Sequence, residues 1–232
     1  MKIFVGILII LLVFVTIGVV TYLKLTSFVN EIDISEPENG EDGGITQPTK
    51  REIKNYLFYA EILMKPAYRS IVKKCELNGD EKVMDFGSGA GPSSSLIAKE
   101  LEDGSGELTC LDISESWIKV VKHRFQEYDH VNYLLGDITT MDLAKDVYDV
   151  ILIHFVLHDI ERSIRSDVIN HLAAILKPGG RLIIREPTSN NHGMPAEEVQ
   201  ELMQKNGLVE KSLVLKKMMF LIPVVEGSFY KK

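Results

Sequence analysis

The chain has 232 residues, of which 45% are hydrophobic and 25% are charged, and its formal net charge at pH 7 is -7. This length allows one substantial α/β domain and little more. The negative charge argues against a general nucleic-acid-binding surface, which would be basic. Two cysteines, Cys75 and Cys110, are too few for a disulfide framework and indicate reduced thiols in a cytosolic domain.

The chain begins with an apolar run from Ile3 to Leu23, flanked by Lys2 and Lys24. A helix of this length, at about 1.5 Å per residue, reaches about 30 Å, the thickness of a bilayer hydrocarbon core. A cleaved signal peptide would have a shorter apolar core of roughly 7–15 residues. We therefore expect residues 1–24 to be a transmembrane anchor that contacts the membrane through residues 3–23.

Residues 25–50 are polar, and their centre, Glu36–Gly44, consists of acids, glycines, a proline and an asparagine. Such a composition cannot bury enough apolar surface to fold. We expect a flexible acidic linker here, followed by a folded domain over residues 51–232.

The folded domain begins with helical spacing of apolar residues over 56–77, where Pro66 indicates a break between two helices. Short apolar strands then alternate with amphipathic helices. The predicted strands are Lys82–Phe86, Glu107–Asp112, Val131–Leu135, Tyr148–His154 and Arg181–Glu186, and the predicted helices are Ser93–Leu101, Glu115–Phe125, Arg162–Leu176 and Ala196–Asn206.

This alternation predicts an α/β fold with a doubly wound, mostly parallel sheet. The run Val150–Ile153 is apolar throughout, as expected for a parallel strand that is covered on both faces. The segment Lys177–Gly180 ends the preceding helix with a proline–glycine stop. Two further strands, near Leu213–Leu215 and Phe220–Tyr230, bring the expected total to seven.

The most informative segment is a glycine-rich turn between the first strand and its helix, with the pattern Asp-x-Gly-x-Gly-x-Gly. Such a turn lets backbone N–H groups approach a polar ligand without side chains in the way. The dinucleotide fingerprint Gly-x-Gly-x-x-Gly fits less well, because Pro92 or Ser94 stands where its third glycine belongs. The residues of the turn are Asp85, Gly87, Ser88, Gly89 and Gly91.

Polar residues end or directly follow each of the first five strands. In doubly wound sheets, ligands bind beyond the carboxyl ends of the strands, near the point where strand order reverses. One acid at a strand end is more often a helix cap or a turn residue. Several together predict a binding site, and here they are Asp85, Asp112, Asp137, His154 and Glu186.

The glycine turn resembles the first motif of class I S-adenosylmethionine-dependent methyltransferases, and the resemblance extends over about residues 53–232. It implies a Rossmann-like methyltransferase fold with S-adenosyl-L-methionine as cofactor. Asp112 is similar to the family's ribose-binding acid, and Asp137 to the residue that accepts a hydrogen bond from adenine. The complete set implied to bind the cofactor is Asp85, Gly87, Ser88, Gly89, Gly91, Asp112, Ile113, Asp137, Ile138 and His154.

The segment Leu157-His158-Asp159 resembles one in small-molecule O-methyltransferases, where the histidine is the general base. Histidine suits this role because its ordinary pKa lies near 6.5, and Asp159 could orient it. In the alternative interpretation, Asp159 caps the next helix and His158 is only partly buried. Related quinone and sterol methyltransferases place histidines in this loop without that role.

Residues 51–75 are rich in aromatic residues, which core packing would explain equally well but which are expected to form a lid that favours a small apolar or aromatic acceptor. The expected membrane anchor further predicts that this acceptor is lipid-soluble. The resemblance also implies that the catalytic domain lies on the cytoplasmic side of the membrane, where the methyl donor is made.

Two alternatives remain open, a non-catalytic cofactor-binding or scaffold module on a membrane and an NAD(P)-dependent oxidoreductase. Neither histidines nor cysteines have metal-ligand spacing, so no metal site is predicted.

Overall fold

The computed structural model describes the backbone of residues 2–34, 47–189, 192–219 and 221–232, and side chains from residue 12 onward within these ranges, apart from 14 and 192. The helices are α1 (Lys2–Glu31), α2 (Lys50–Ile62), α3 (Lys65–Val72), α4 (Pro92–Leu101), α5 (Glu115–Arg124), α6 (Arg165–Ile175) and α7 (Ala196–Lys205), and the short 3-10 turns are η1 (Lys73–Cys75) and η2 (Leu157–Asp159). The strands are β1 (Lys82–Phe86), β2 (Glu107–Asp112), β3 (Val131–Leu135), β4 (Tyr148–His154), β5 (Leu176–Ser189), β6 (His192–Gly193), β7 (Leu208–Met218) and β8 (Ile222–Lys231).

The sheet has the order β3-β2-β1-β4-β5-β8-β7, and the short β6 pairs with β5 outside this path. Strands β1 to β5 run parallel, whereas β8 is antiparallel to both of its neighbours. The predicted doubly wound, mostly parallel sheet of seven strands is therefore confirmed. The chain builds outward from β1 to β3 and then returns to place β4 on the other side of β1, so strand order reverses at β1 and β4.

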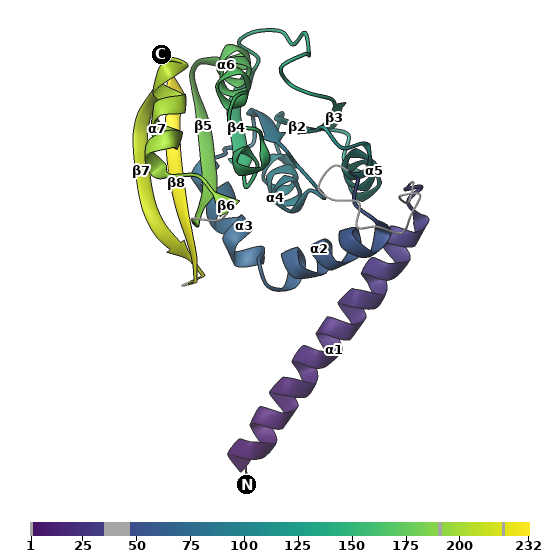
Figure 1. Ribbon diagram of the computed structural model, residues 1–232. Coiled ribbons are helices and arrows are strands. Elements are labelled where there is room, and N and C mark those ends of the chain that lie inside the picture. The colour runs from purple at the N-terminus through teal and green to yellow at the C-terminus, as the bar shows by residue number, and fades with distance from the viewer. Residues whose placement is uncertain (1, 35–46, 190–191, 220) are drawn as a thin grey trace.

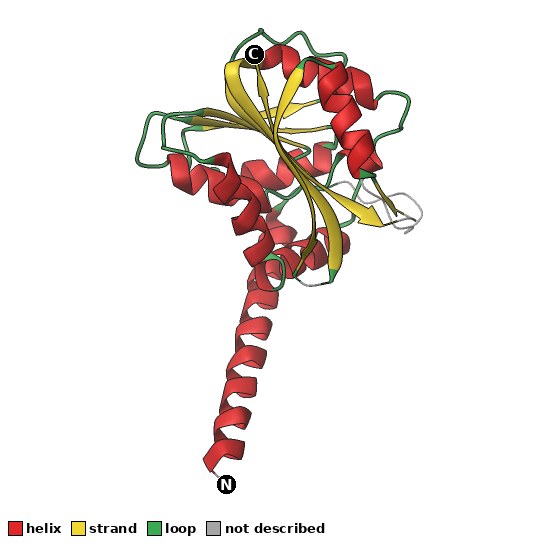
Figure 2. Cartoon of the chain, turned by 90° about the vertical axis from the view of Figure 1, so that its left-hand side faces the viewer, coloured by secondary structure: helices red, strands yellow, loops and turns green. Residues whose placement is uncertain are grey.

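Helices cover both faces of the sheet (Figures 1 and 2). One core cluster contains Val83 of β1 with residues of α3, α4 and α5. The other contains Met84 of β1 with residues of α6 and α7. The alternation of side chains along β1 explains this division, because successive residues of a strand point to opposite faces.

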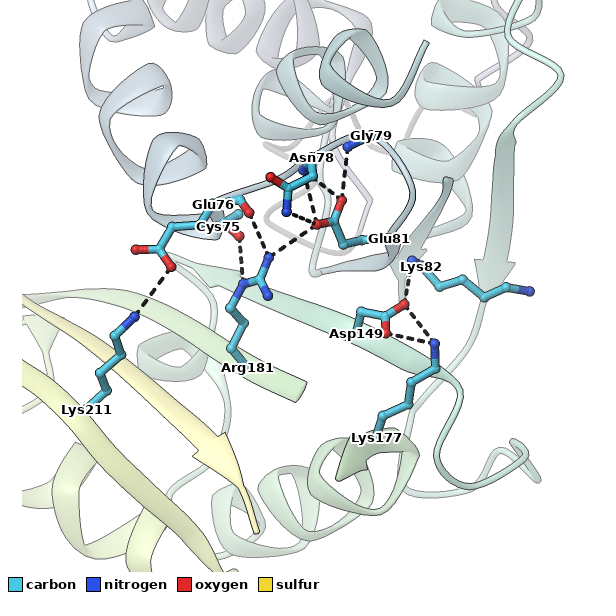
Figure 3. Close-up of polar contacts among 10 residues, drawn as sticks. All are labelled: Cys75, Glu76, Asn78, Gly79, Glu81, Lys82, Asp149, Lys177, Arg181 and Lys211. Atoms are coloured by element: carbon cyan, nitrogen blue, oxygen red, sulfur yellow. Dashed lines mark hydrogen bonds and ion pairs between the residues drawn. The ribbon is translucent and has the colours of Figure 1, made fainter. Parts of the chain in front are cut away.

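A set of charged contacts ties the amino ends of β1, β4 and β5 together (Figure 3). Arg181 donates hydrogen bonds to the backbone carbonyls of Cys75, at 2.7 Å, and Glu76, at 2.9 Å. Asp149 accepts from Lys177 Nζ at 2.7 Å and from the Lys82 backbone N–H at 2.9 Å. These contacts lie at the edge opposite the predicted site, which leaves the carboxyl edge for ligand chemistry.

The predicted proline–glycine stop lies inside the range of β5 rather than before it. Helix α6 ends at Ile175, and the pairing of β4 with β5 shifts register between Tyr148 and Val150 to accommodate the extra residues. Gly179 has φ +77, a backbone conformation that residues with a side chain rarely adopt. The turn is thus a bulge in the strand pair and not a separate connection.

The end of α1 packs on the domain, although residues 25–31 were predicted to belong to the linker. Val29 is 1% exposed and clusters with Ile53 and Leu57 of α2 and with Trp117 of α5. Burial of apolar side chains stabilises this helix end against the domain. Helix α1 therefore continues through residues 25–31, and the centre of the predicted linker, residues 35–46, lies outside the described residues.

The amino-terminal part of α1 projects away from the other elements (Figures 1 and 2). Across the described parts of the chain, no helix has both the length and the apolar character needed to cross a membrane. The predicted transmembrane anchor at residues 1–24, and the single-pass localisation that followed from it, thus have no support. One residue of that segment, Tyr22, instead contacts Phe58 of α2 edge to face, with ring centroids 5.8 Å apart.

Docking of α1 is testable with two substitutions on the same helix. We expect Val29→Ala to lower the free energy of unfolding by about 1–3 kcal/mol, because it removes buried methyl groups. Leu23→Ala is the matched control, since Leu23 is 62% exposed, and we expect a change within about 0.5 kcal/mol. Urea unfolding of the full chain measures both, and equal effects would mean that Val29 is not buried.

Candidate functional site

The glycine turn has a backbone that other residues would not adopt. Gly87 and Gly91 have φ +70 and +76. A Cβ at Gly87 would lie 2.5 Å from Val156 Cγ2, and one at Gly91 would lie 2.9 Å from the Phe125 ring. The turn is held to β2 because the N–H groups of Gly87 and Ser88 donate to the Leu111 carbonyl at 2.8 and 3.0 Å. The glycines are thus required by conformation and by close packing.

Asp112 connects the end of β2 to the glycine turn. Its Oδ2 accepts the Gly89 N–H at 2.8 Å, and its Oδ1 accepts the Ser114 N–H at 2.9 Å. The residue is 7% exposed. Burial raises the pKa of Asp112, and the backbone hydrogen bonds oppose this change. Because a carboxylate has about four acceptor positions, Asp112 retains capacity for further donors.

Asp85 points into the protein toward α4. It is 2% exposed, and its Oδ2 accepts a hydrogen bond from Ser94 Oγ at 2.5 Å. Burial raises the pKa of Asp85 to about 7; the Ser94 hydrogen bond opposes the change, and the nearby Asp112 adds to it. A positive charge bound close by would favour its ionised form.

Two buried polar atoms at this edge lack hydrogen-bond partners among the described residues, Ser88 Oγ and His154 Nε2. The other ring nitrogen of His154, Nδ1, lies 3.3 Å from Ser93 Oγ. Burial, reinforced by the Arg185 charge, lowers the pKa of His154 to about 3, so its imidazole is neutral. Buried polar groups are almost always paired, so two unpaired ones beside the glycine turn indicate a place for a polar ligand.

Two exposed apolar side chains lie at the carboxyl ends of β2 and β3. Ile113 is 59% exposed, as expected for a residue that would face an adenine ring, and Leu135 is 48% exposed. Ile138, which the resemblance implied to belong to the cofactor-binding set, is 2% exposed and lies in the core cluster. Leu135 pairs with Asp112 in register.

Asp137 has a local role in the turn after β3. Its Oδ1 accepts hydrogen bonds from both the backbone N–H and the hydroxyl of Thr139, each at 2.8 Å. This is an Asx-type turn, in which a side chain replaces a backbone acceptor. The turn orients the Asp137 carboxylate just after β3, which is where the sequence placed an adenine-recognising acid.

His158 forms a close pair with Glu186, which lies in β5. Its Nδ1 is 2.6 Å from Glu186 Oε2, whereas its Nε2 is 3.5 Å from Asp159 Oδ2. Burial alone lowers the pKa of His158, but the hydrogen bond and charge of Glu186, aided by Asp159, outweigh it and raise the pKa. Glu186 is therefore the closer of the two acids, although the sequence predicted Asp159 to orient the ring.

Glu186 also holds the backbone of the η2 turn. It is 0% exposed, and its Oε1 accepts the N–H groups of Val156 at 3.0 Å and Leu157 at 2.9 Å. From the sequence, Glu186 was predicted only as a strand-end acid. A signal for its partnership was available, because β4 and β5 were predicted as consecutive parallel strands whose carboxyl ends would be adjacent.

Phe155, between the two histidines, has φ +60, which is strained for an aromatic residue. Its ring centroid is 4.5 Å from that of His154 and 6.3 Å from that of His158. The Phe155 N–H donates to the Arg185 carbonyl at 2.9 Å, which anchors the conformation. The strain is thus localised at the point where β4 leaves the sheet.

Helix α2 lies over the glycine turn. The Tyr56 hydroxyl would be 3.8 Å from a Cβ at Gly89, and it is 3.2 Å from the Tyr68 hydroxyl of α3. Arg124 of α5 donates to the Ala90 carbonyl at 3.0 Å and also forms a close ion pair with Glu61 of α2. These contacts hold aromatic side chains of residues 51–75 beside the predicted site, in the region expected to form a lid.

Comparison with known proteins gives a family match over residues 77–220, to the model described as a methyltransferase domain. Among curated relatives, the demethylmenaquinone methyltransferase of Clavibacter sepedonicus is 28% identical over 106 residues, covering 46% of this chain and 41% of that protein. The match therefore spans less than half of that relative's length.

Solved structures share the fold at low sequence identity. A TehB-like SAM-dependent methyltransferase from Corynebacterium glutamicum has a TM-score of 0.63 and 16% identity, covering 79% of this chain and 100% of its own. Phosphoethanolamine N-methyltransferase 2 of Haemonchus contortus, solved with S-adenosyl-L-methionine, has a TM-score of 0.59 and 14% identity, covering 72% and 52% respectively. At these identities the similarity concerns the fold.

The packing of Gly87 against Val156 is open to a direct test. We expect Gly87→Ala to lower the free energy of unfolding by about 2–4 kcal/mol, since it combines left-handed strain with overpacking. Gly179→Ala is the control, because Gly179 has φ +77 with nothing within 4 Å of its Cβ position. Strain alone predicts a loss of about 1–2 kcal/mol there. Equal losses in urea unfolding would remove the steric argument.

Proposed function

The chain belongs to the family of methyltransferase domains, and from this we propose that it is an S-adenosylmethionine-dependent methyltransferase acting on a small aromatic acceptor of the quinone type. The observation that carries the proposal is the set of groups at one sheet edge: the glycine turn, Asp112, and the unpaired Ser88 Oγ and His154 Nε2. The curated relative described above is a demethylmenaquinone methyltransferase, and its name supports the acceptor class.

The residues at this edge fit the cofactor's chemistry. Ser88 and His154 offer buried polar atoms for its charged amino-acid end, and Asp112 offers acceptor capacity for its ribose hydroxyls. Asp137 would accept from its adenine amino group, and the exposed side chains of Ile113 and Leu135 would pack against the adenine ring. When bound, the cofactor supplies an electrophilic methyl group on a positively charged sulfur, a charge that Asp85 complements.

For the acceptor, Phe155 offers an aromatic surface next to His158. Planar rings stack on aromatic side chains with a gain beyond simple burial. His158 then removes the proton that the acceptor loses as it becomes a nucleophile, and its Nε2 is the nitrogen that does not bond to Glu186. Glu186 fixes the ring and stabilises the imidazolium that results. Asp159 lies on the Nε2 side and supports the same protonated form.

The first test concerns the cofactor. We expect the full chain to bind S-adenosylmethionine and its demethylated product in titration calorimetry. Asp112→Ala should weaken this binding by about 1–3 kcal/mol, the usual cost of losing hydrogen bonds to a charged group. Asp103→Ala, at an exposed acid, should leave the affinity unchanged. Absence of binding at millimolar cofactor would contradict the proposal.

The second test concerns the base. Because the base must be neutral, methyl transfer to a quinol should rise with pH through a pKa above the ordinary 6.5 of histidine. His158→Gln should lower kcat by about 10²- to 10⁴-fold without changing cofactor affinity. Glu186→Gln removes the interaction that raises the pKa, so the rise should move to lower pH.

The matched control is His171→Gln, since His171 is a partly exposed histidine of α6 that hydrogen-bonds to the Asp167 carbonyl within its own helix. Its activity and pH profile should equal those of the native chain. A His158→Gln variant that is folded, binds the cofactor and retains native kcat would eliminate His158 as the base.

A further inference from the structure

We propose that Arg165 is a positioning residue for His158: from α6 it holds the backbone of the η2 turn, while Glu198 of α7 fixes the guanidinium itself. The inference rests on the proposed role of His158 in methyl transfer. It assigns a task to a buried ion pair that lies outside the cofactor-binding edge.

The contacts of Arg165 converge on the backbone around His158. Its Nη2 donates to the His158 carbonyl at 3.0 Å, and its Nε donates to the Ile160 carbonyl at 2.9 Å. Its Nη1 donates to Glu198 Oε1 at 2.8 Å. A guanidinium is planar, so these three bonds define one orientation of the group. The turn is therefore fixed at residues on both sides of Asp159.

His158 is consequently held from two directions. Glu186 bonds to its ring from β5, and Arg165 bonds to its carbonyl from α6. Arg165 is 8% exposed, and burying a charge is costly unless the group is paired and hydrogen-bonded. Because both the ring and the backbone carbonyl of His158 are held, the position of this base is restricted. A shift of about 1 Å in a catalytic group can cost about 10²-fold in rate.

Arg165 also acts electrostatically on His158. Within the described parts of the chain, the imidazole is faced by Glu186 from β5, Asp159 from η2 and Arg165 from α6, with Glu198 of α7 behind the arginine. Burial lowers the pKa of His158, the two acids raise it, and Arg165 opposes them. Loss of the arginine charge should therefore raise this pKa further and move the pH dependence of methyl transfer to higher pH.

Three variants separate position from charge. Arg165→Gln should lower kcat by about 10- to 100-fold, with KM and cofactor affinity within about twofold, and should raise the His158 pKa measured by NMR of its ring. Arg165→Lys keeps the charge but not the planar fork, so it should restore the native pH profile and only part of kcat. Glu198→Gln should lower kcat while leaving the His158 ring bonded to Glu186.

Arg162→Gln is the matched control. Arg162 Nε lies 3.4 Å from the same Glu198 oxygen, but the Arg162 side chain is 80% exposed. Loss of this guanidinium should therefore change neither kcat nor the His158 pKa. Circular dichroism establishes that each variant is folded, and Arg165→Lys and Glu198→Gln carry the test if Arg165→Gln does not fold.

The outcomes distinguish this inference from the proposed function. A folded Arg165→Gln protein with native kcat and an unchanged His158 pKa overturns the positioning role. A shifted His158 pKa without a change in methyl transfer overturns the base role of His158, and with it the part of Arg165 in the reaction. Equal losses in Arg165→Gln and Arg162→Gln would indicate a general effect on α6 and also overturn the inference.

Discussion

The site depends on the parallel pairing of β1 with β2 on one side and with β4 on the other. This arrangement brings the carboxyl ends of three strands together at the point where strand order reverses. In doubly wound sheets this reversal point is where ligands bind. Asp85, Asp112 and His154 reach one place because their strands end there, although they are far apart in the chain.

Desolvation determines much of the chemistry at this edge. The Asp85 carboxyl and the His154 imidazole are both buried. Burial raises the pKa of Asp85 and lowers that of His154, so it favours the neutral form of each group. His158 is the contrasting case, because the Glu186 carboxylate outweighs its burial. Two histidines four residues apart thus acquire opposite protonation tendencies, and only His158 is suited to accept a proton.

A second buried charge lies on the other side of β5. Arg185, next to Glu186, is 0% exposed and pairs with Glu226 of β8 at 2.8 Å, while its Nη1 donates to the Ala67 carbonyl of α3. The same strand therefore supplies an acid to the η2 turn and a cation to α3. Arg185 thereby connects β5 to β8 and to α3, whose Tyr68 contacts the His154 ring edge to face.

The amino-terminal region illustrates how local composition misleads. Residues 25–31 mix polar and apolar side chains, and the apolar Leu25, Phe28 and Val29 are spaced to meet α2 and α5. One buried stripe is enough to dock a helix end, even when its other faces are polar. The same reasoning applies to Ile138, whose neighbours in sequence suggest a binding surface but whose side chain enters the core.

The sequence by itself determined the fold class, the bounds of β1 to β4 and the glycine turn, because these depend on local periodicity and on conformations that only glycine adopts. It also placed His158 in the loop after β4 and acids at the strand ends. The tertiary structure alone decided that Glu186 is the acid closest to the His158 ring, that Ile138 enters the core, and that Arg165 reaches the η2 turn. Such partnerships join residues far apart in the chain, and their distances follow from strand register and helix packing rather than from spacing in the sequence.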